Sequence, residues 1–554
     1  MSRFEVHAHD HYSNLRLLDC INRPKDLVNR AIELGLSGIA ITNHDTVASH
    51  MELNLYQQEI QKEHSDFKIA LGNEIYLCGS RDSGQKYYHF ILIAKNKMGQ
   101  RAIRELSSRA WMNSYYDRGM ERVVTLYEDL QEIVEKYPNS LIATTACLGG
   151  ELSTRAVAYA KAKELNDIET QTEEHKQIVN FVMWCKHLFG NDFYIEVAPG
   201  CSKDQIIANK QLAGIAHSMG VSMVIGTDAH YLRKEDRFIH KSYLNSKDGD
   251  REVDDFYEYS YLQTEDEIKE HIADSFLNYY DLVANSEEIY QKIENYSLAH
   301  NQTIPKVVVE DYPQLDMPPL DWNRFPTLAK MFMSNNKIER YWVNECVNKL
   351  YDLNKMGDIV YLSRLEEEAD IKMTISEKLG TNMFAYPVTL QHYVDMFWES
   401  GSMVGAGRGS SCSGLNHYLL GITQLDPIEW DLPFWRYLNK DRVELGDIDL
   451  DLCPSKRPLI LKKIKEERGQ FFYDDIDELS RQNLGCTLIA TYGTEGTRST
   501  ILTACRGYRS EDYPDGIDVD TAQYMSSLIP VERGFLWYLD EVVNGNKDKG
   551  RKPI

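Results

Sequence analysis

Histidines, carboxylates and one thiol recur in the first 230 residues at the ends of short apolar runs. Two pairs have the form H-x-H and D-x-H. Because residues i and i+2 of a strand point to the same side, each pair can face one site. Histidine and cysteine are ligands that Zn²⁺ prefers, and carboxylates also admit Mn²⁺ or Fe²⁺. The candidate ligands are His7, His9, Asp19, His44, Glu74, His89, Cys147, Asp228 and His230.

The whole set of donors is stronger evidence for a metal site than any one of them. A single histidine in a strand is more often an ordinary core or surface residue. In α/β folds the catalytic face lies at the carboxyl ends of the strands. Donors at the ends of successive strands favour a cluster of two or three metal ions. Such a cluster suits hydrolysis of a phosphate ester, because one ion generates hydroxide while the others hold the phosphate oxygens.

A Gly- and Ser-rich segment and an acidic segment form a second chemical pattern. GSMVGAGRGSSCSG (401–414) can direct backbone N–H groups at a phosphate, with Arg408 as a further donor, although such loops are more often plain linkers. In DIDLD (447–451) carboxylates alternate with apolar residues, which is strand periodicity and places three aspartates on one face. Charges so close repel unless cations lie between them, so we favour Mg²⁺ binding over a solvated acidic strand edge.

Alternating strand and helix patterns must position the first set of residues. Helical segments lie between most expected strands; one covers residues 24–35, with Pro24 at its start and Gly35 at its end. This order is typical of a mainly parallel sheet, and periodicity does not distinguish a closed barrel from an open doubly wound sheet. From about residue 286 to 400 the pattern is largely helical. The expected strands cover residues 4–9, 38–42, 69–77, 87–94, 140–147, 193–198 and 222–227.

Composition bounds the class of protein. The 554 residues allow about three to four domains, and 43% hydrophobic with 26% charged residues excludes a wholly disordered chain. A net charge of −24 argues against coating nucleic acid by bulk charge. Ten cysteines without a C-x-x-C pair indicate reduced thiols. A polar N-terminus and the lack of a long apolar run predict a cytoplasmic protein without a signal peptide or membrane span.

The first pattern resembles the polymerase-and-histidinol-phosphatase (PHP) domain. The segments HAHDHYS, ITNHDT, GNEIYL, HFILIAKN, ACLGGEL and IGTDAHY carry this resemblance. They look most like the version at the N-terminus of bacterial C-family DNA polymerases, the alpha subunit of DNA polymerase III. The resemblance implies a (β/α) barrel of about seven strands, with the nine donors above holding two to three Zn²⁺ or Mn²⁺ ions for a 3′–5′ exonuclease. Asn43 departs from the usual T-D-H, and an amide there supplies no charge.

The second pattern is similar to the palm of the same polymerases, in VGAGRGSSCSG and in LLGITQLDPIEWDLPFWRYLNKDRVELGDIDLDLCPSKR. The resemblance implies a mixed α+β, nucleotidyltransferase-like palm that uses Mg²⁺. Asp447 and Asp449 match two of its three catalytic carboxylates. Gly446 and Leu452 replace the usual Pro and Phe without touching these carboxylates. The implied nucleotide-binding residues are Gly407, Arg408, Gly409, Ser410, Ser411, Arg436 and Arg442.

Residues 487–508 resemble the helical thumb that follows the palm. Arg498 and Arg506 match DNA-backbone contacts there, and solvated surface arginines are an equal alternative. The expected domains are a PHP domain over 1–285, the first part of the palm with a helical lead-in over 286–465, and a thumb-like segment over 466–554.

The third palm carboxylate belongs to an F-D-x-L-G-type strand that this sequence lacks, and the resemblance covers only the first half of a typical family member. The chain is therefore expected to be either a fragment of a longer reading frame or part of a split, phage-like polymerase that needs a C-terminal half. The leading hypothesis is a DNA-directed DNA polymerase with a PHP-linked 3′–5′ exonuclease. It acts on primer–template DNA and dNTPs, and a sliding clamp and other replisome subunits would bind through the missing part. The alternatives are a stand-alone PHP phosphoesterase or exonuclease and a non-catalytic half of a split polymerase.

Overall fold

Seven strands form the sheet that positions the first set of donors. The computed structural model describes residues 2–554 apart from 83, 118, 247–255, 301–303, 305–306, 313–319 and 470–484. Neighbouring strands are hydrogen-bonded in the order of their numbers, and β7 (Thr125–Leu126) adds to the end of β3. The seven are β1 (Phe4–Ala8), β2 (Gly38–Ile41), β3 (Lys68–Cys78), β4 (Tyr87–Ala94), β8 (Leu141–Thr144), β9 (Phe193–Val197) and β10 (Met223–Ile225).

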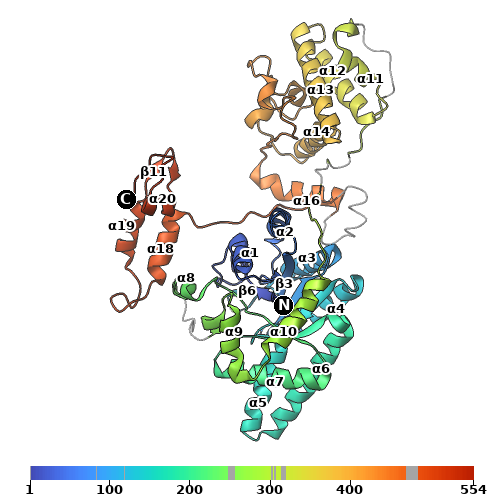
Figure 1. The fold of residues 1–554 in the computed structure, drawn as a ribbon. Coiled ribbons are helices and arrows are strands. Elements are labelled where there is room, and N and C mark those ends of the chain that lie inside the picture. Colours follow the sequence, from blue (N-terminus) through green and yellow to red (C-terminus); the bar gives the residue numbers. More distant parts are fainter. Residues whose placement is uncertain are drawn as a thin grey trace. The chain divides into compact units, whose positions relative to one another are not determined.

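The sheet returns on itself beyond β10. The backbone N–H of His9 donates to the carbonyl of Ala229 at 3.0 Å, and the N–H of Ala229 donates to the carbonyl of His7 at 3.3 Å. These bonds join β1 to the residues that follow β10, so the strands form a barrel-like sheet (Figure 1). The structure thus confirms a (β/α) barrel of about seven strands, which periodicity alone left open.

One strand runs against the others. β4 is antiparallel to both β3 and β8, whereas the other neighbours in the seven-strand order are parallel. The short connection 79–86 between β3 and β4 suits an antiparallel pair, because a parallel pair needs a longer crossover. Because β4 is reversed, its first residues lie at the edge of the sheet where the parallel strands end.

Successive side chains on a strand point to opposite faces of the sheet, and this alternation separates two apolar layers. On β4, Ile91 and Ile93 pack with Ala40, Ala70 and other interior residues, whereas Phe90 and Leu92 pack against the helices outside. All these side chains are buried, as expected of a strand that is covered on both faces. The barrel is thus filled by side chains below the level of the donors.

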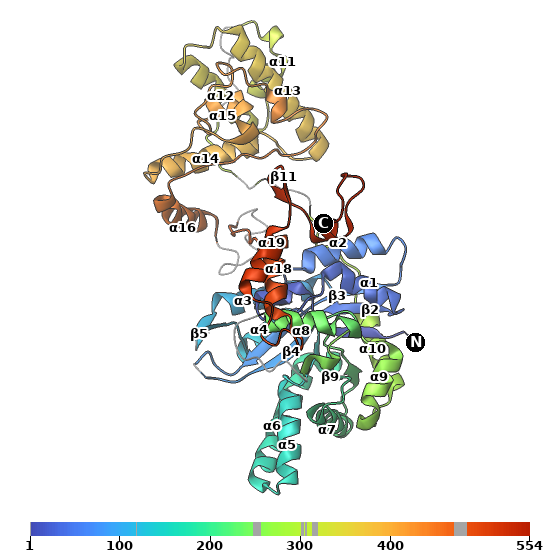
Figure 2. The ribbon, with the colours of Figure 1, turned by 90° about the vertical axis from the view of Figure 1, so that its left-hand side faces the viewer.

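Helices surround the barrel, and Figure 2 shows α5 and α6 side by side as they extend away from it. The turn before α3 uses Asn96, whose side chain accepts from the N–H groups of Met98 and Gly99. The helices are α1 (Pro24–Glu33), α2 (His50–Ile60), α3 (Lys97–Met112), α4 (Tyr127–Lys136), α5 (Glu151–Glu164), α6 (Ile168–Phe189), α7 (Lys203–Met219), α8 (Arg237–Asn245), α9 (Glu265–Ile272) and α10 (Tyr279–Lys292).

The described chain divides into two compact units, 1–299 together with 492–554, and 300–491. In the first unit, α18 (Thr497–Gly507) packs on α8, where a Cβ on Gly507 would lie 1.7 Å from the carbonyl oxygen of Ser242. Two further helices, α19 (Val519–Ser527) and α20 (Leu539–Asn544), follow. The domain boundaries expected at 285/286 and 465/466 stay a prediction, because compact units need not coincide with functional domains.

The second unit is helical in its described residues. Its core forms around Trp342, Leu365 and Phe384, all buried. Its helices are α11 (Pro326–Phe332), α12 (Lys337–Asp352), α13 (Ile359–Leu379), α14 (Ala385–Glu399), α15 (Leu415–Leu419) and α16 (Arg457–Arg468).

The strand expected at 447–451 appears as extended backbone with isolated bridges. Arg408 bridges Asp449 and Val404 bridges Leu452, both antiparallel. Within the described residues this run makes isolated bridges and no continuous ladder, so the strand that the alternation predicted does not form. No helix among the described residues has both the length and the apolar character needed to cross a membrane.

Candidate metal centre and palm site

All nine predicted donors lie at one edge of the barrel. His7 is in β1 and His9 follows it, while Asp228 and His230 follow β10. His89 stands near the start of β4 and still reaches the same edge, because that strand is antiparallel. Glu74 comes from β3 where this long strand extends past β2. Eight of the nine donors are buried, and His89 is partly exposed.

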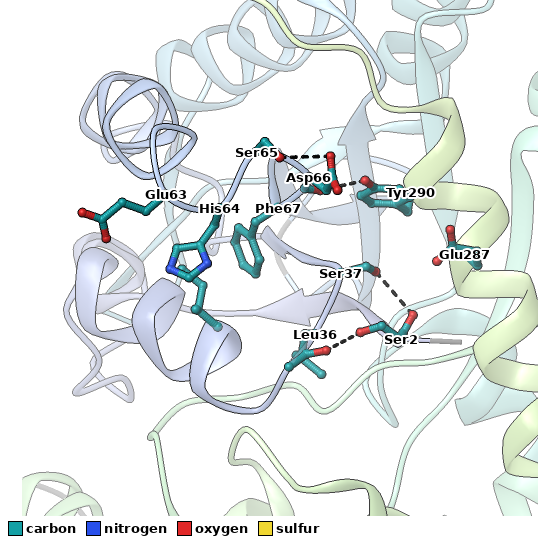
Figure 3. Close-up of a pocket in the computed structure, with 12 residues that line it drawn as sticks. Ser2, Leu36, Ser37, Glu63, His64, Ser65, Asp66, Phe67, Glu287 and Tyr290 are labelled. Carbon is teal, nitrogen blue, oxygen red and sulfur yellow. Dashed lines mark hydrogen bonds between the residues drawn. The ribbon is translucent and has the colours of Figure 1, made fainter.

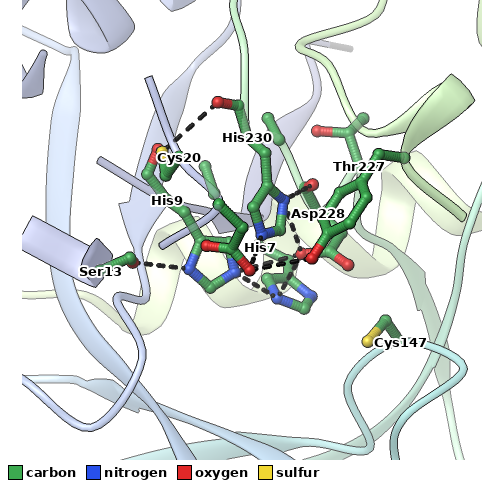
Figure 4. A network of polar contacts seen from close by, with 12 residues as sticks. His7, His9, Ser13, Cys20, Cys147, Thr227, Asp228 and His230 are labelled. Carbon is green, nitrogen blue, oxygen red and sulfur yellow. Dashed lines mark hydrogen bonds and ion pairs between the residues drawn. The ribbon is translucent and has the colours of Figure 1, made fainter. Parts of the chain in front are cut away.

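Four of these residues, His7, His9, Glu74 and Asp228, surround one point. Figure 4 shows His7, His9 and Asp228 of this group. The Nε2 atoms of His7 and His9 lie 3.0 Å apart. Glu74 Oε2 lies 2.9 Å from Nε2 of His7 and 3.1 Å from that of His9. Asp228 Oδ1 lies 3.1 Å from each of the same two nitrogens. Two imidazoles and two carboxylates therefore direct their donor atoms at a common space.

Two further groups share members with the first. Glu74 also contacts His89, whose Nδ1 lies 3.5 Å from the sulfur of Cys147. His9, His44 and His230 form the third group.

Asp19 joins the third group through its Oδ2 atom. This oxygen lies 3.5 Å from Nε2 of His44 and 3.6 Å from Nε2 of His230. Asp19 is buried in the loop that follows β1. With this residue, the structure brings all nine predicted donors together.

The donor set fits divalent metal ions. Both ring nitrogens of His44 and Oδ1 of Asp19 are buried and make no hydrogen bond in the described residues. Buried polar atoms normally have partners, so unpaired donor atoms that converge in this way are what a metal site requires. Imidazole, carboxylate and thiolate are also the ligand types that borderline metals take.

The electrostatics keep the carboxylates ionised. Burial raises the pKa of Glu74, but His89 and His44 outweigh burial and hold the pKa well below its usual range. Burial lowers the pKa of His230, and Asp228 with Asp19 reverses this and raises it to about 9. Negative and basic groups are therefore balanced at the centre, and a bound cation would take the place of protons on the histidines.

Glu196 in β9 is a residue of this centre that the sequence patterns did not indicate. Its Oε1 accepts from Nδ1 of His7 at 2.6 Å, which directs Nε2 of His7 at the other donors. A Cβ on Gly226 would lie 2.3 Å from the same oxygen, so glycine makes room for Glu196. The one signal in the sequence is an acidic residue within the apolar strand FYIEV.

Asn43 supports the site through its amide. Its Oδ1 accepts from the N–H of Asp10 at 2.8 Å and from the hydroxyl of Ser13 at 3.0 Å, and its Nδ2 donates to Ser49 at 3.0 Å. Ser13 in turn contacts Nδ1 of His9 at 3.1 Å. The amide thus fixes the loop that begins at residue 10 without adding charge.

We expect Glu196→Gln to weaken metal binding about 10- to 100-fold, the usual effect of losing a carboxylate behind a ligating histidine. An amide can still accept from His7 but no longer raises the basicity of its ring. Titration of the metal-free chain with Mn²⁺ or Zn²⁺ measures the affinity. Glu33→Gln, at an exposed carboxylate on α1, is the matched control. Equal affinities for the two variants would contradict this role.

A cavity of about 700 Å³ lies at the opposite end of the barrel (Figure 3). Ser2, Ser37 and Phe67 line it, and each stands just before β1, β2 or β3. It is therefore at the amino ends of the parallel strands, away from the nine donors and from the face where α/β barrels bind substrates.

In the second unit, the Gly- and Ser-rich loop lies against the aspartates. Arg408 contacts Asp449 at 3.4 Å and Asp451 at 3.3 Å. Asp447, Asp449 and Asp451 are exposed, while Ile448 and Leu450 between them are partly buried. Three carboxylates therefore share one solvent-facing side, as the alternation predicted.

The loop is shaped by glycine. Gly409 has a φ of +71°, and a Cβ there would lie 3.3 Å from Oδ2 of Asp449. Gly407 has a φ of +132°. Ser411 is buried, and its hydroxyl donates to the carbonyl of Arg408 at 2.8 Å. The backbone thereby approaches the aspartates closely, and Ser410 lies in the same turn, a 3₁₀ helix over Gly409–Ser413.

The two other predicted basic residues of this unit are exposed and make other contacts. Arg442 pairs with Glu444 at 2.6 Å, and Arg436 is exposed in the 3₁₀ helix Phe434–Arg436. Among the described ion pairs, neither joins Asp447 or Asp449. Their role in nucleotide binding stays a prediction.

Helix α13 makes hydrogen bonds to the end of the Gly- and Ser-rich loop, and local sequence patterns did not indicate these contacts. Glu368 is fully buried and accepts from the N–H groups of Leu415 and Asn416 at 2.7 and 2.9 Å. Arg364 donates to the carbonyl of Ser413 at 2.9 Å. One buried carboxylate and one arginine thus fix the end of the Gly- and Ser-rich loop.

Lys372 gives α13 a pH-dependent stability. Burial lowers the pKa of Lys372 from 10.5 to about 8, against the opposing effect of Glu368. Between pH 8 and 10.5 the unfolded chain binds more protons than the folded chain, so the free energy of unfolding of unit 300–491 rises with pH. Below pH 8 the buried charge costs about 3 kcal/mol.

We therefore expect Lys372→Met to stabilise this unit by up to about 3 kcal/mol at pH 7 and to remove the rise between pH 8 and 10.5. Hydrogen exchange of α13 at several pH values measures the local free energy of opening. Lys349→Met, at an exposed position of α12, is the control and should leave the rise intact. A rise that persists in Lys372→Met would contradict this assignment.

The two predicted thumb arginines make contacts within their own unit. Arg498 donates to the carbonyl of Ile529 at 3.0 Å, and Arg506 donates to that of Ser246 at 3.4 Å. Neither arginine belongs to the metal centre. Their contact with DNA stays a prediction.

Two protein families match this chain: the PHP domain over residues 5–199 and the bacterial DNA polymerase III alpha NTPase domain over residues 336–551. "Probable DNA polymerase YorL" of Bacillus subtilis is 37% identical over 99% of this chain and 42% of its own length. A "DNA-directed DNA polymerase" of Bacillus phage SPbeta gives the same values. "DNA polymerase III subunit alpha" of Borreliella burgdorferi is 26% identical over 85% of this chain and 37% of its own length. The chain thus spans about two fifths of these relatives.

Proposed function

The chain belongs to the C-family DNA polymerases with an N-terminal PHP region, and from this membership we propose that it acts in template-directed DNA synthesis with a linked 3′–5′ exonuclease. The convergence of nine donors at one edge of the barrel is the observation that carries the exonuclease. The contact of Arg408 and its loop with the acidic run supports the synthetic site.

At the barrel, the nine donors would hold two to three Zn²⁺ or Mn²⁺ ions, which supply activated water and positive charge for phosphodiester hydrolysis when bound. Glu196 keeps His7 in one orientation, and Ser13 does the same for His9. Eight of the nine donors are buried, which limits the access of bulk water to their ligand atoms. The chain itself thus provides a fixed frame for a terminal phosphodiester.

At the palm, Asp447 and Asp449 would hold Mg²⁺, which neutralises charge on the triphosphate when bound. The backbone of residues 407–411 would bind the triphosphate oxygens, with Arg408 released from the aspartates to join them. The primer 3′-hydroxyl attacks the α-phosphorus of a dNTP, and pyrophosphate leaves. Selectivity for DNA sequence is expected to be slight, because such contacts are to the backbone.

The partners of this reaction are primer–template DNA and dNTPs. A C-terminal polymerase half that brings the third carboxylate is a further partner, and a sliding clamp would bind outside the residues present here. Arg498 and Arg506 would contact the duplex backbone after leaving their present carbonyl acceptors.

Comparison of two substrates tests this proposal against a stand-alone phosphoesterase. The purified chain with Mn²⁺ is given a 5′-labelled primer–template and, separately, p-nitrophenyl phosphate. The proposal predicts that the primer is shortened from its 3′ end and that the monoester is a poor substrate. Turnover of the monoester with an intact primer would contradict it and favour the phosphoesterase.

A further inference from the structure

A cavity of about 520 Å³ lies on the outer side of strand β4, against helices α5 and α6. Its volume is within the range of about 300–1,000 Å³ that holds small ligands in proteins. The carboxylate of Glu151 lies in its wall, where it pairs with Arg155. Aromatic rings and long basic side chains also line it. They are Lys86, Tyr88, Tyr127, Arg155, Phe181 and Trp184.

The aromatic rings of this cavity have accessible surfaces. Tyr88 and Trp184 are only partly buried. Trp184 and Tyr127 meet edge to face, with ring centroids 5.2 Å apart. Rings fixed in this way offer flat apolar surfaces of the kind on which nucleobases stack.

Two cations flank Tyr88. Lys86 Nζ lies 5.0 Å and Arg155 Cζ lies 5.7 Å from the centre of its ring. Glu151 holds Arg155 at 2.8 Å, and Glu174 holds it at 3.1 Å, so the guanidinium has a fixed place. Lys86 is exposed beside the cavity, where it can reach a phosphate.

The cavity and the metal centre share a wall. Tyr88 faces outward and its neighbour His89 faces the other donors, because successive strand residues point to opposite sides. His89 also donates its N–H to the carbonyl of Gly149 at 3.0 Å, within the segment that runs from Cys147 to Glu151. This segment therefore carries a metal-site donor at one end and a residue of the cavity at the other.

We propose that this cavity binds one unpaired nucleobase of a single-stranded DNA end, next to the nucleotide whose phosphodiester enters the metal centre. The proposal rests on the exonuclease function proposed above. Stacking on Tyr88 and Trp184 would hold the base, and the amides of Gln177 and Asn180 can meet the edges of any base. The site would favour a frayed end over a paired one, because a paired base cannot enter.

Binding without turnover tests this site. A short 5′-fluorescein-labelled single strand with phosphorothioate linkages at its 3′ end is titrated with the full chain in Ca²⁺ and followed by anisotropy. A series of strands carries one abasic nucleotide at successive positions from the 3′ end. We expect one position to weaken binding about tenfold in the wild type, the usual effect of losing one stacked base.

In Tyr88→Leu, an abasic nucleotide at the same position should not weaken binding of the strand any further. Tyr88→Phe should behave as the wild type. Tyr280→Leu is the matched control, at a tyrosine of α10 that is 61% exposed. An abasic loss that is equal in wild type and Tyr88→Leu, or that occurs at no position, would overturn the site. Because no hydrolysis is needed, an inactive metal centre would not change this reading.

Discussion

Glu74→Gln is expected to lower exonuclease activity at least about 10³-fold while the barrel stays folded. The Glu74 carboxylate lies between His7 and His9 on one side and contacts His89 on the other, so it joins two of the three donor groups. An amide has the same shape but no charge, and loss of several kcal/mol of charge stabilisation corresponds to this factor in rate. Single-turnover shortening of a 5′-labelled primer in Mn²⁺ measures it.

The control for this variant is Glu59→Gln, at an exposed carboxylate of α2. It should degrade the primer as the wild type does. Thermal unfolding of both variants shows whether the barrel is intact. Activity of Glu74→Gln within tenfold of the wild type, with an unchanged melting temperature, would mean that the nine donors do not form the reactive site.

Asp449→Asn is expected to lower template-directed primer extension at least about 10³-fold. Asp449 lies next to Gly409 of the Gly- and Ser-rich loop and pairs with Arg408. It is therefore the carboxylate that contacts both the loop backbone and the guanidinium. Removing its charge removes a ligand of the Mg²⁺ that neutralises the triphosphate. Incorporation of a labelled dNTP measures the effect, with this chain alone or with a polypeptide that supplies a third carboxylate.

If no preparation extends the primer, Mg²⁺-dependent binding of a fluorescent dNTP replaces incorporation as the measurement. Binding should then weaken at least about tenfold in Asp449→Asn. Asp441→Asn, at an exposed aspartate before the acidic run, is the control. An Asp449→Asn variant that binds and incorporates nucleotide as the control does would remove Asp449 from the site.

The sequence predicted the barrel strands because each is a short apolar run bounded by polar residues. The run expected over 38–42 forms a strand over Gly38–Ile41, and the run expected over 87–94 forms a strand with those bounds. The sequence did not predict the direction of β4. Direction depends on which neighbours a strand pairs with, and its pattern of buried residues is the same either way.

The candidate donors could be predicted because their spacing follows the strands, as in His7 with His9. Glu196 could not, because it reaches His7 across 189 positions of the chain. The same holds for Glu368, which meets Leu415 and Asn416 from another helix. Contacts of this kind have no local period, so only the folded chain brings them together.

Closure of the sheet also depended on backbone contacts that no sequence pattern indicated. The backbone bonds of Ala229 with His9 and His7 join segments from the two ends of the barrel. Once these bonds form, one edge of the barrel necessarily carries His7, His9, Asp228 and His230. The metal centre is therefore a consequence of closure as much as of residue type.

The most direct test of the account is a gel of a 5′-labelled primer on its template, with the purified chain, Mn²⁺ and no nucleotides. We expect bands shorter than the primer in the wild type and in Asp449→Asn, and an intact primer in Glu74→Gln. This pattern would assign 3′–5′ degradation to the barrel and not to the palm. An intact primer in the wild type, or equal shortening in all three proteins, would contradict the assignment.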